Sequence, residues 1–404
     1  MPNAKKNSAA AVSCVAVSFT ACGGRSEHAK KLNIDTAVSI NIWYQDDAYT
    51  SYLDYIAQQF HKANEFITVN PVKVEENNLL DAVYNGSIAQ NNVADVYLME
   101  ASDMQRAYLM GLTAENDAYT QYYSQKHFPV TAVNAACYEG KLYGYPVTFH
   151  TAVMVYNKKY TTAPENFEQI EAFLNSYQVT DENKDVNMIV GWDTQDLWTN
   201  YAFGGSYVDN GGAQGEDAES DVQTEALKAA MTEYAALQNT FGIVDKTQEE
   251  YKQMFINNQL IYTILDSTQL ADLNASGVDY GICAVPGAKT GFGTQSLSDT
   301  TLAMVNPYSE NTDTAKAVAQ AISYDYADLL EKDTGYISAR TDVADKNKKV
   351  LYQPLYEVYA KSDSYAKYIG ADEFYVRYSI LLHNIWKGED LNESVDAFIK
   401  AVSR

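Results

Sequence analysis

The sequence lacks most of the signatures by which enzymes and metalloproteins are recognised. Its 404 residues include four cysteines, Cys14, Cys22, Cys137 and Cys283, and these form neither a CxxC pair nor a zinc-ligand spacing. The five histidines include no HExxH motif, and no GxSxG, P-loop or GxGxxG sequence occurs. The sequence therefore gives no support for the common hydrolytic, nucleotide-dependent or zinc-dependent chemistries.

Basic residues are also scarce. Lys and Arg number 29 and Asp and Glu number 53, so the net charge is −24. A body this acidic repels phosphate backbones, which makes nucleic acid a poor partner. Disorder is excluded as well, because 46% of the residues are hydrophobic and the charges are scattered. The length suggests two domains.

Tyrosine is the residue present in excess. The chain has 33 Tyr against 13 Phe and 4 Trp, a strong preference for the aromatic side chain that carries a hydroxyl. Tyrosine offers a ring face and a hydrogen-bonding group together. This property suits a binding cleft at a handful of positions, but it gives no functional account of most of the 33.

The N-terminal segment resembles a bacterial lipoprotein signal. Lys5 and Lys6 precede a weakly apolar stretch, 9–21, which ends in Phe19-Thr20-Ala21-Cys22. The stretch is too short for a membrane-spanning helix, and no later apolar run approaches 18 residues. The resemblance implies a signal peptide at 1–21, a lipidated Cys22 and a tether over 22–37. Phe19 replaces the usual leucine, and an ordinary secretory leader or a chance cysteine in a disordered end stays open.

Apolar periodicity along the body predicts strands that alternate with helices, which indicates α/β architecture with parallel sheets. The expected strands are 38–43, 67–74, 94–98, 152–156, a short one closed by 191–192, 260–265, 280–285 and 301–305. The expected helices are 53–60, 79–89, 104–110 (ended by Gly111), 164–177 (opened by Pro164), 195–203, 222–238, 248–257, one between 265 and 280, 312–323, 326–332, 350–360, 372–387 and 392–402.

In this order of elements the chain resembles the extracellular solute-binding proteins of ABC importers, in their maltodextrin-binding branch. The most specific piece is Tyr138-Glu-Gly-Lys-Leu-Tyr-Gly-Tyr-Pro146 followed by Val155-Tyr-Asn-Lys158, which is similar to the family's crossover between lobes. Other matching pieces are Ile42-Trp43, Ala94-Asp95-Val96-Tyr97 with Gly111-Leu112, Phe255 with Tyr262, and Ser394-Val-Asp-Ala-Phe398. Ala94 stands where proline is common, and Asn258 replaces a glycine.

The resemblance implies the two-lobed fold of type II periplasmic binding proteins, in which each lobe is a central sheet flanked by helices. Lobe one would comprise 38–148 and 287–331, and lobe two 149–286 and 332–404. Hinges are expected near 147–151, 285–287 and 332–335. The ligand would lie between the lobes at the carboxyl ends of strands.

Two lobe-one loops are implied to contact ligand. Tyr44 and Asp47 follow the first strand, and Asp47 stands where maltodextrin binders place a sugar-binding aspartate. Ala48 departs from their neighbouring lysine, and a solvated turn is the competing interpretation. Glu100 and Asp103 follow the third strand, although Asp103 could equally be a helix N-cap.

Lobe two supplies the other candidates. His150 lies just past the crossover, where relatives carry a glutamate, but a core or hinge histidine would look the same. Trp192, Asp193 and Trp198 match an aromatic and acidic loop, in which at least one tryptophan would stack on a sugar ring. Core packing is the alternative for both tryptophans.

Three further lobe-two positions complete the candidate site. Asp266 leaves the 260–265 strand at a cleft-facing end, and an N-cap role competes with ligand contact. Tyr375, with Phe374, stands where relatives stack a Trp-Tyr pair, and core packing competes. Tyr336, beside the expected hinge at Gly335, is a weaker candidate.

The resemblance implies a non-enzymatic receptor that captures an oligosaccharide, most simply a malto-oligosaccharide, and delivers it to permease subunits. No cofactor and no metal are expected, and the protein would be a monomer anchored to the outer face of the bacterial membrane by lipid. Polyamine and ferric ion are alternative solutes, the latter because of Tyr122-Tyr123. A surface glycosidase is the alternative outside the class, and it would need two carboxylates flanking the scissile bond.

Overall fold

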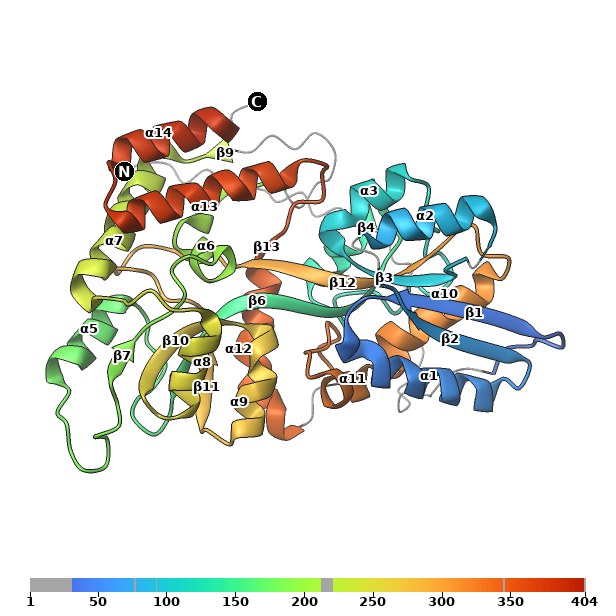
Figure 1. Cartoon of the computed structure of the whole chain (residues 1–404), viewed down its shortest axis with the longest axis horizontal. Helices are drawn as coiled ribbons and strands as arrows, with labels where there is room; N and C mark the ends of the chain where they lie inside the picture. Colours follow the sequence, from blue (N-terminus) through green and yellow to red (C-terminus); the bar gives the residue numbers. More distant parts are fainter. Residues whose placement is uncertain (1–30, 76–77, 92, 212–220, 344–345, 403–404) are drawn as a thin grey trace.

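The computed structural model describes residues 31–75, 78–91, 93–211, 221–343 and 346–402. The expected signal peptide, Cys22 and the first part of the expected tether lie outside these residues. In the described ranges, no helix combines the length and apolarity needed to cross a membrane. Figure 1 shows two α/β bodies joined at the middle by long strands.

Nine strands of the described chain form one sheet, in which the path is β2-β1-β3-β12-β6-β10-β7, with β11 beside β6 and β13 beside β12. Their bounds are β1 Val38–Tyr44, β2 Ile67–Lys73, β3 Val96–Glu100, β6 Tyr145–Asn157, β7 Met188–Val190, β10 Leu260–Asp266, β11 Tyr280–Cys283, β12 Leu297–Val305 and β13 Asp363–Ser364. Strands β1, β2 and β3 pair in parallel, whereas β12 is antiparallel to both β3 and β6.

Strand β6 belongs to both bodies. Its first half pairs with β12, from Tyr145 opposite Ala303 to Thr151 opposite Ser298. Its second half pairs with β10 and β11, from Ala152 opposite Asp266 to Asn157 opposite Tyr280. One continuous strand therefore runs from one lobe into the other, with β12 beside it (Figure 1).

Helices cover the sheet in each lobe. On the side of β1–β3 these are α1 Thr50–Ala63, α2 Leu79–Ala89, α3 Met104–Leu109, α4 Val130–Ala135, α10 Thr312–Gln320 and α11 Ala327–Thr334, with a π-turn at Ala321–Asp325. On the other side they are α5 Phe167–Ser176, α6 Leu197–Gly205, α7 Thr224–Phe241, α8 Gln248–Ile256, α9 Leu270–Ser276, α12 Lys346–Lys361, α13 Ala371–Lys387 and α14 Leu391–Val402. Short 3₁₀ turns occur at Asp47–Tyr49, Ala101–Asp103 and Ser267–Gln269, and two small hairpins pair β4 Cys137–Tyr138 with β5 Lys141–Leu142 and β8 Val208–Asp209 with β9 Asp221–Val222.

Local sequence explains several helix ends. Asn78 and Asn166 cap α2 and α5 by accepting hydrogen bonds from backbone amides three residues on, and Thr247 forms a capping box at α8. The prediction that Pro164 opens a helix was wrong, because the Asn166 side chain satisfies the first turn and sets the start at Phe167. Gly111, with φ of +70°, follows α3 as predicted.

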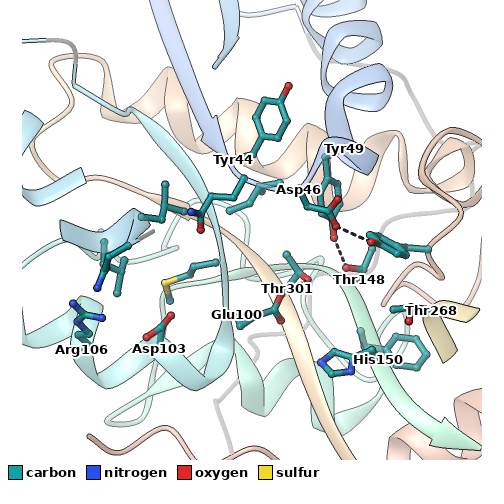
Figure 2. A pocket seen from close by; sticks show the side chains of 18 residues that line it. Tyr44, Asp46, Tyr49, Glu100, Asp103, Arg106, Thr148, His150, Thr268 and Thr301 are labelled. Atoms are coloured by element: carbon teal, nitrogen blue, oxygen red, sulfur yellow. Dashed lines mark hydrogen bonds between the residues drawn. The ribbon is translucent and has the colours of Figure 1, made fainter. Parts of the chain in front are cut away.

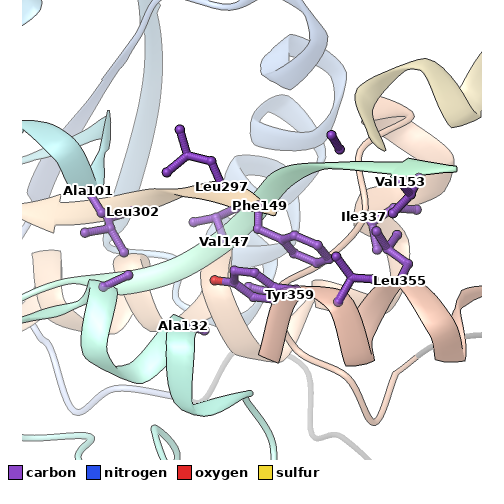
Figure 3. Close-up of a cluster of buried hydrophobic side chains, with 14 of the residues drawn as sticks. Ala101, Ala132, Val147, Phe149, Val153, Leu297, Leu302, Ile337, Leu355 and Tyr359 are labelled. Carbon is purple, nitrogen blue, oxygen red and sulfur yellow. The ribbon is translucent and has the colours of Figure 1, made fainter. Parts of the chain in front are cut away.

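The core continues beneath the crossing strands. Phe149 on β6 stacks on Tyr359 of α12, with ring centroids 3.8 Å apart and planes 4° apart (Figure 3). Val147, Leu302 and Leu355 are also buried in this cluster. Burial of these apolar groups stabilises the junction of the lobes, at about 25 cal/mol per Å² removed from water.

Two segments locate the other crossings between the lobes. Residues just after the expected hinge at 285–287 still contact lobe two, since the Phe167 amide donates to the Gly287 carbonyl and the Gln295 amide to the Ala202 carbonyl. Beyond these contacts the chain enters β12, which pairs with β3 of lobe one. Just after the expected hinge at 332–335, the Ala339 amide donates to the Val147 carbonyl and so joins this segment to β6.

Candidate functional site

A cavity of about 350 Å³ opens where strands β1 and β3 end. The carboxyl ends of parallel strands meet at one edge of a sheet, so the loops that follow them converge there. Figure 2 shows Tyr44 at the end of β1 and Asp46 in the loop after it, and Glu100 at the end of β3 and Asp103 after it, around this space. His150 from the crossing strand β6 completes the wall.

A second cavity, of about 690 Å³, adjoins the first. Both are lined by Glu100, Asp103, Arg106 and His150, so the two form one continuous cleft. Other residues line the second cavity alone, including Ser102, Trp198, Asp299, Tyr365, Lys367 and Tyr368. The first cavity has more hydroxyl groups, and Trp198, Tyr365 and Tyr368 give the second cavity aromatic faces of its own.

The loop after β1 presents Asp46 rather than Asp47. Asp46 lines the cavity and accepts a 2.7 Å hydrogen bond from the hydroxyl of Tyr336, while its other oxygen caps the Asp47–Tyr49 turn. The Asp47 side chain is 78% exposed and forms a 2.8 Å ion pair with Lys73. The prediction of ligand contact at Asp47 was therefore displaced by one residue, because the turn reverses which carboxylate faces inward.

Tyrosines close the same end of the first cavity. Tyr49 shares a 2.6 Å hydrogen bond with the hydroxyl of Thr148, and its ring meets that of Tyr336 edge-on at 5.7 Å. Tyr44 lines the cavity, although only 3% of it is exposed. Its hydroxyl donates a hydrogen bond to the Thr50 hydroxyl, so the hydroxyl of Tyr44 is already bonded within the protein.

Glu100 and Asp299 place two carboxyl groups at the junction of the cavities. Glu100 Oε1 accepts a 2.9 Å hydrogen bond from Thr301, whereas Oε2 is buried and has no hydrogen-bond partner in the described part of the chain. Burial and the nearby Asp299 charge raise the pKa of Glu100, and burial likewise raises the pKa of Asp299. These carboxyl groups are poised to accept hydrogen bonds from a donor that enters the cleft.

Asp103 is a wall of the cleft and not a capping residue. It precedes α3, but its side chain makes no hydrogen bond to the first turn of that helix. It lines both cavities, and burial raises its pKa against the opposing charge of Arg106. Arg106 itself is paired with Asp81 at 2.9 Å.

His150 is held by Asp266 from behind. His150 Nδ1 and Asp266 Oδ2 lie 2.9 Å apart. Burial alone would lower the pKa of His150, but the charge of Asp266 and this hydrogen bond outweigh it and raise the pKa to about 9. The Asp266 carboxylate also caps the Ser267–Gln269 turn and lines neither cavity. Direct ligand contact by Asp266 was thus a wrong expectation, because the competing cap and the histidine occupy both oxygens.

The two tryptophans have different roles. Trp192 is fully buried, packs against Phe203 and Trp386 at ring distances of 5.7 and 5.5 Å, and donates from Nε1 to Asn200. Its assignment as a stacking platform was wrong, since the core encloses it. Trp198, on the first turn of α6, lines the second cavity with its ring 4.3 Å from that of His150.

Asp193 and Tyr375 support the cleft indirectly. Asp193 lines neither cavity, since its carboxylate accepts from the backbone amides of Gln195 and Gln248. Tyr375 is 2% exposed and stacks beneath Tyr365 at 3.8 Å. Both were expected to touch ligand, and both are instead occupied by packing or loop hydrogen bonds.

Asp46, Tyr49, Asp299, Tyr365 and Lys367 are among the lining residues that sequence reasoning missed. Asp46 is adjacent to the predicted Asp47, so the sequence indicated this acidic pair but not which of its two carboxylates faces the cavity. Tyr365 and Lys367 precede α13 in a segment with no strand or helix pattern. Only their tertiary neighbours bring them to the cleft.

The tryptophan assignments can be separated by stability. We expect Trp192→Ala to lower the free energy of unfolding by about 3–5 kcal/mol, because it leaves a cavity in the core. Trp198→Ala should cost clearly less, since the ring lines a solvent-filled space. Urea titration followed by circular dichroism measures both, and equal losses would contradict the placement of Trp192.

The His150–Asp266 pair predicts a pH dependence of stability. The raised pKa of His150 means that its stabilising charge is fully present below its ordinary pKa of about 6.5 and is lost as pH rises through about 9. The difference in unfolding free energy between the wild type and His150→Gln should therefore shrink over that interval. His383→Gln, at an exposed histidine, is the control and should show a flat difference. A constant difference for His150→Gln would refute the pairing.

Comparison with known proteins agrees with this architecture. The family model described as "Bacterial extracellular solute-binding protein" matches residues 55–356. Maltodextrin-binding protein MdxE of Bacillus subtilis (strain 168) is 22% identical over 292 residues, which cover 68% of this chain and 66% of that protein, just under two thirds.

Solved structures show the same fold. A cyclo/maltodextrin-binding protein complexed with maltotetraose superposes with a TM-score of 0.75 at 16% identity, covering 92% of this chain and 98% of that one. An extracellular solute-binding protein from Staphylococcus aureus in complex with maltose gives 0.73 at 18% identity, with 91% and 98% covered. The predicted two-lobed fold is confirmed. Because the family model spans most of the sequence, the chain belongs to the bacterial extracellular solute-binding proteins.

Proposed function

We propose that the protein is the extracellular receptor of a carbohydrate ABC importer. It captures an oligosaccharide, most simply a malto-oligosaccharide, and delivers it to permease subunits without catalysing a reaction. The observation that carries this proposal is the continuous cleft beside β6 and β12, in which carboxyl groups, hydroxyls and aromatic rings face one space.

The chemistry of this cleft suits a sugar. Aromatic faces such as Trp198 and Tyr365 can cover the C–H side of a pyranose ring, while Asp46, Glu100 and Asp103 can accept hydrogen bonds from hydroxyls. A maltodextrin-binding protein is among the curated relatives, and bound maltose and maltotetraose occur in the structural neighbours. These likenesses support the choice of malto-oligosaccharide.

Capture would proceed by closure of the lobes. We assign lobe one to 38–148 and to the chain from β12 to 331, and lobe two to 149–286 and 332–404. The intervening residues 287–295 lie beside lobe two. Affinity then depends on how much better the closed form holds the solute than the open form does. The protein would act as a monomer, since each chain contains both lobes of its cleft.

A polyamine is the second candidate solute. The observation that favours it is the buried Glu100 Oε2 atom without a partner in the described chain, beside Asp299 and Asp103. An ammonium group could supply both the missing donor and a counter-charge. Ferric ion has less support, because Tyr122 packs on Tyr324 and Tyr123 on Phe128, away from the residues that line the cleft.

Titration calorimetry with maltotetraose, spermidine and ferric citrate decides among these solutes. We expect heat of binding with maltotetraose and a loss of about 1–3 kcal/mol in Trp198→Ala, the scale of one stacking platform. Tyr308→Ala, at an exposed ring that lines neither cavity, is the matched control. Heat with spermidine or iron alone would reject the sugar assignment, and chromatographic detection of shortened sugars would favour a glycosidase.

We also propose that cleavage after Ala21 exposes Cys22 for lipidation and that the lipid holds the protein on the outer face of the membrane. The support is the Phe19-Thr20-Ala21-Cys22 sequence. In a bacterial host fed labelled palmitate, the wild type should carry label in the membrane fraction. Cys22→Ser should lose the label while Cys14→Ser keeps it, and label retained in Cys22→Ser would overturn the anchor.

A further inference from the structure

The segment Asp363–Gly370, here called the strap, joins helices α12 and α13. Both helices lie with lobe two, yet the strap reaches across to lobe one. It forms one wall of the second cavity, to which Tyr365, Lys367 and Tyr368 contribute, and it lines no part of the first. The strap therefore lines the second cavity of the cleft but not the first.

Two hydrogen-bonded contacts fix the strap to lobe one. The Lys367 ammonium donates to the backbone carbonyls of Asn134, at 2.5 Å, and Cys137, at 2.8 Å. The Ile369 amide donates to Gln105 Oε1 on α3 at 2.5 Å. Lys367 is only 3% exposed, so its ammonium is enclosed at this contact and does not reach into solvent.

The other contacts of the strap hold an aromatic wall. The Tyr365 ring lies between Tyr375, at 3.8 Å, and Trp198, at 5.8 Å. The Ala366 amide donates to the Tyr375 hydroxyl, and the Tyr365 hydroxyl donates to Asp372. The position of Tyr365 beside Trp198 thus depends on the same short segment that Lys367 fastens.

Burying an ammonium group without a carboxylate partner is costly. Lys367 has two carbonyl acceptors, and burial lowers its pKa to about 8. An apolar side chain could fill the same space at lower cost, but it could not hold two carbonyls of α4 and β4 at fixed distances. The role of Lys367 is therefore to fix the position of the strap relative to lobe one.

We propose that Lys367 is a positioning residue that sets the preference of the receptor for longer oligosaccharides. This rests on the proposed function. A short chain occupies the first cavity, which the strap does not line. A longer chain extends past Glu100 and His150 into the second cavity, where it stacks on the wall that Lys367 holds in place. Loss of the anchor removes affinity for the long chain only.

Calorimetry with maltose and maltohexaose tests the length dependence. In Lys367→Met, maltohexaose affinity should fall about tenfold, on the scale of one stacking contact, while maltose affinity stays within about twofold. Gln105→Leu, which removes the second anchor from lobe one, should change affinity in the same direction. Lys316→Met is the control, because that lysine is also buried but pairs with Asp117 and lines neither cavity. Equal losses for both sugars, or none, would overturn the proposal.

A measurement without sugar keeps this test separate from that of the proposed function. Amide hydrogen exchange of Ile369 should be slow in the wild type and in Lys316→Met, and about tenfold faster in Lys367→Met. Unchanged exchange in a folded Lys367→Met variant refutes the anchor even if no sugar binds. Should that variant not fold, the calorimetric comparison of maltose with maltohexaose in Gln105→Leu tests the strap instead. Absence of binding to both sugars in the wild type refutes the sugar assignment alone.

Discussion

The pairing of β6 with β12 is the contact on which the rest of the molecule depends. These strands run antiparallel across the junction, so each lobe includes part of both. At the middle of these strands, one face of the sheet packs on the Phe149 cluster and the other face lines the cleft. This explains why strands that are otherwise buried carry His150 and Asp299 opposite one another in the register. The residues that cross between the lobes also form the floor of the site.

The floor of the cleft places several ionisable groups at a buried site, and the fold stabilises these groups by pairing them with neighbouring side chains. Asp266 compensates His150, and Thr301 donates to Glu100. Arg106 is occupied by Asp81 and so contributes only part of its charge to the cleft. The carboxyl groups that face the space are left as acceptors without enough donors. The proposed solute, rich in hydroxyls, would supply those donors, and the pairs behind the wall would keep the acceptors aligned before it arrives.

Most of the secondary structure could be predicted from the sequence, since α2 matched its predicted bounds and β10 ended at Asp266, one residue beyond prediction. Apolar periodicity and helix caps are local features of the sequence, and they are sufficient to predict individual helices and strands. The site is harder to predict at the level of single residues. After β1 it is Asp46 and not the expected Asp47 that lines the cavity, and of Trp192 and Trp198 only the second faces the cleft. Lys367 could not be found at all, because its acceptor at Cys137 lies 230 residues away.

The excess of tyrosine has a structural explanation in the described chain. Tyr52 donates to the Ile322 carbonyl, 270 residues along, and Tyr201 donates to Asp363 across lobe two. Phenylalanine would fill the same volumes, but the hydroxyls of Tyr52 and Tyr201 each add a directed bond worth about 1 kcal/mol between segments that are discontinuous in sequence. A protein whose lobes are each assembled from separate stretches gains more from such bonds than one with local connections. Tyr336 and Tyr365 extend the same use of the hydroxyl into the wall of the cleft, where each bonds a carboxylate while its ring lines the space for the solute.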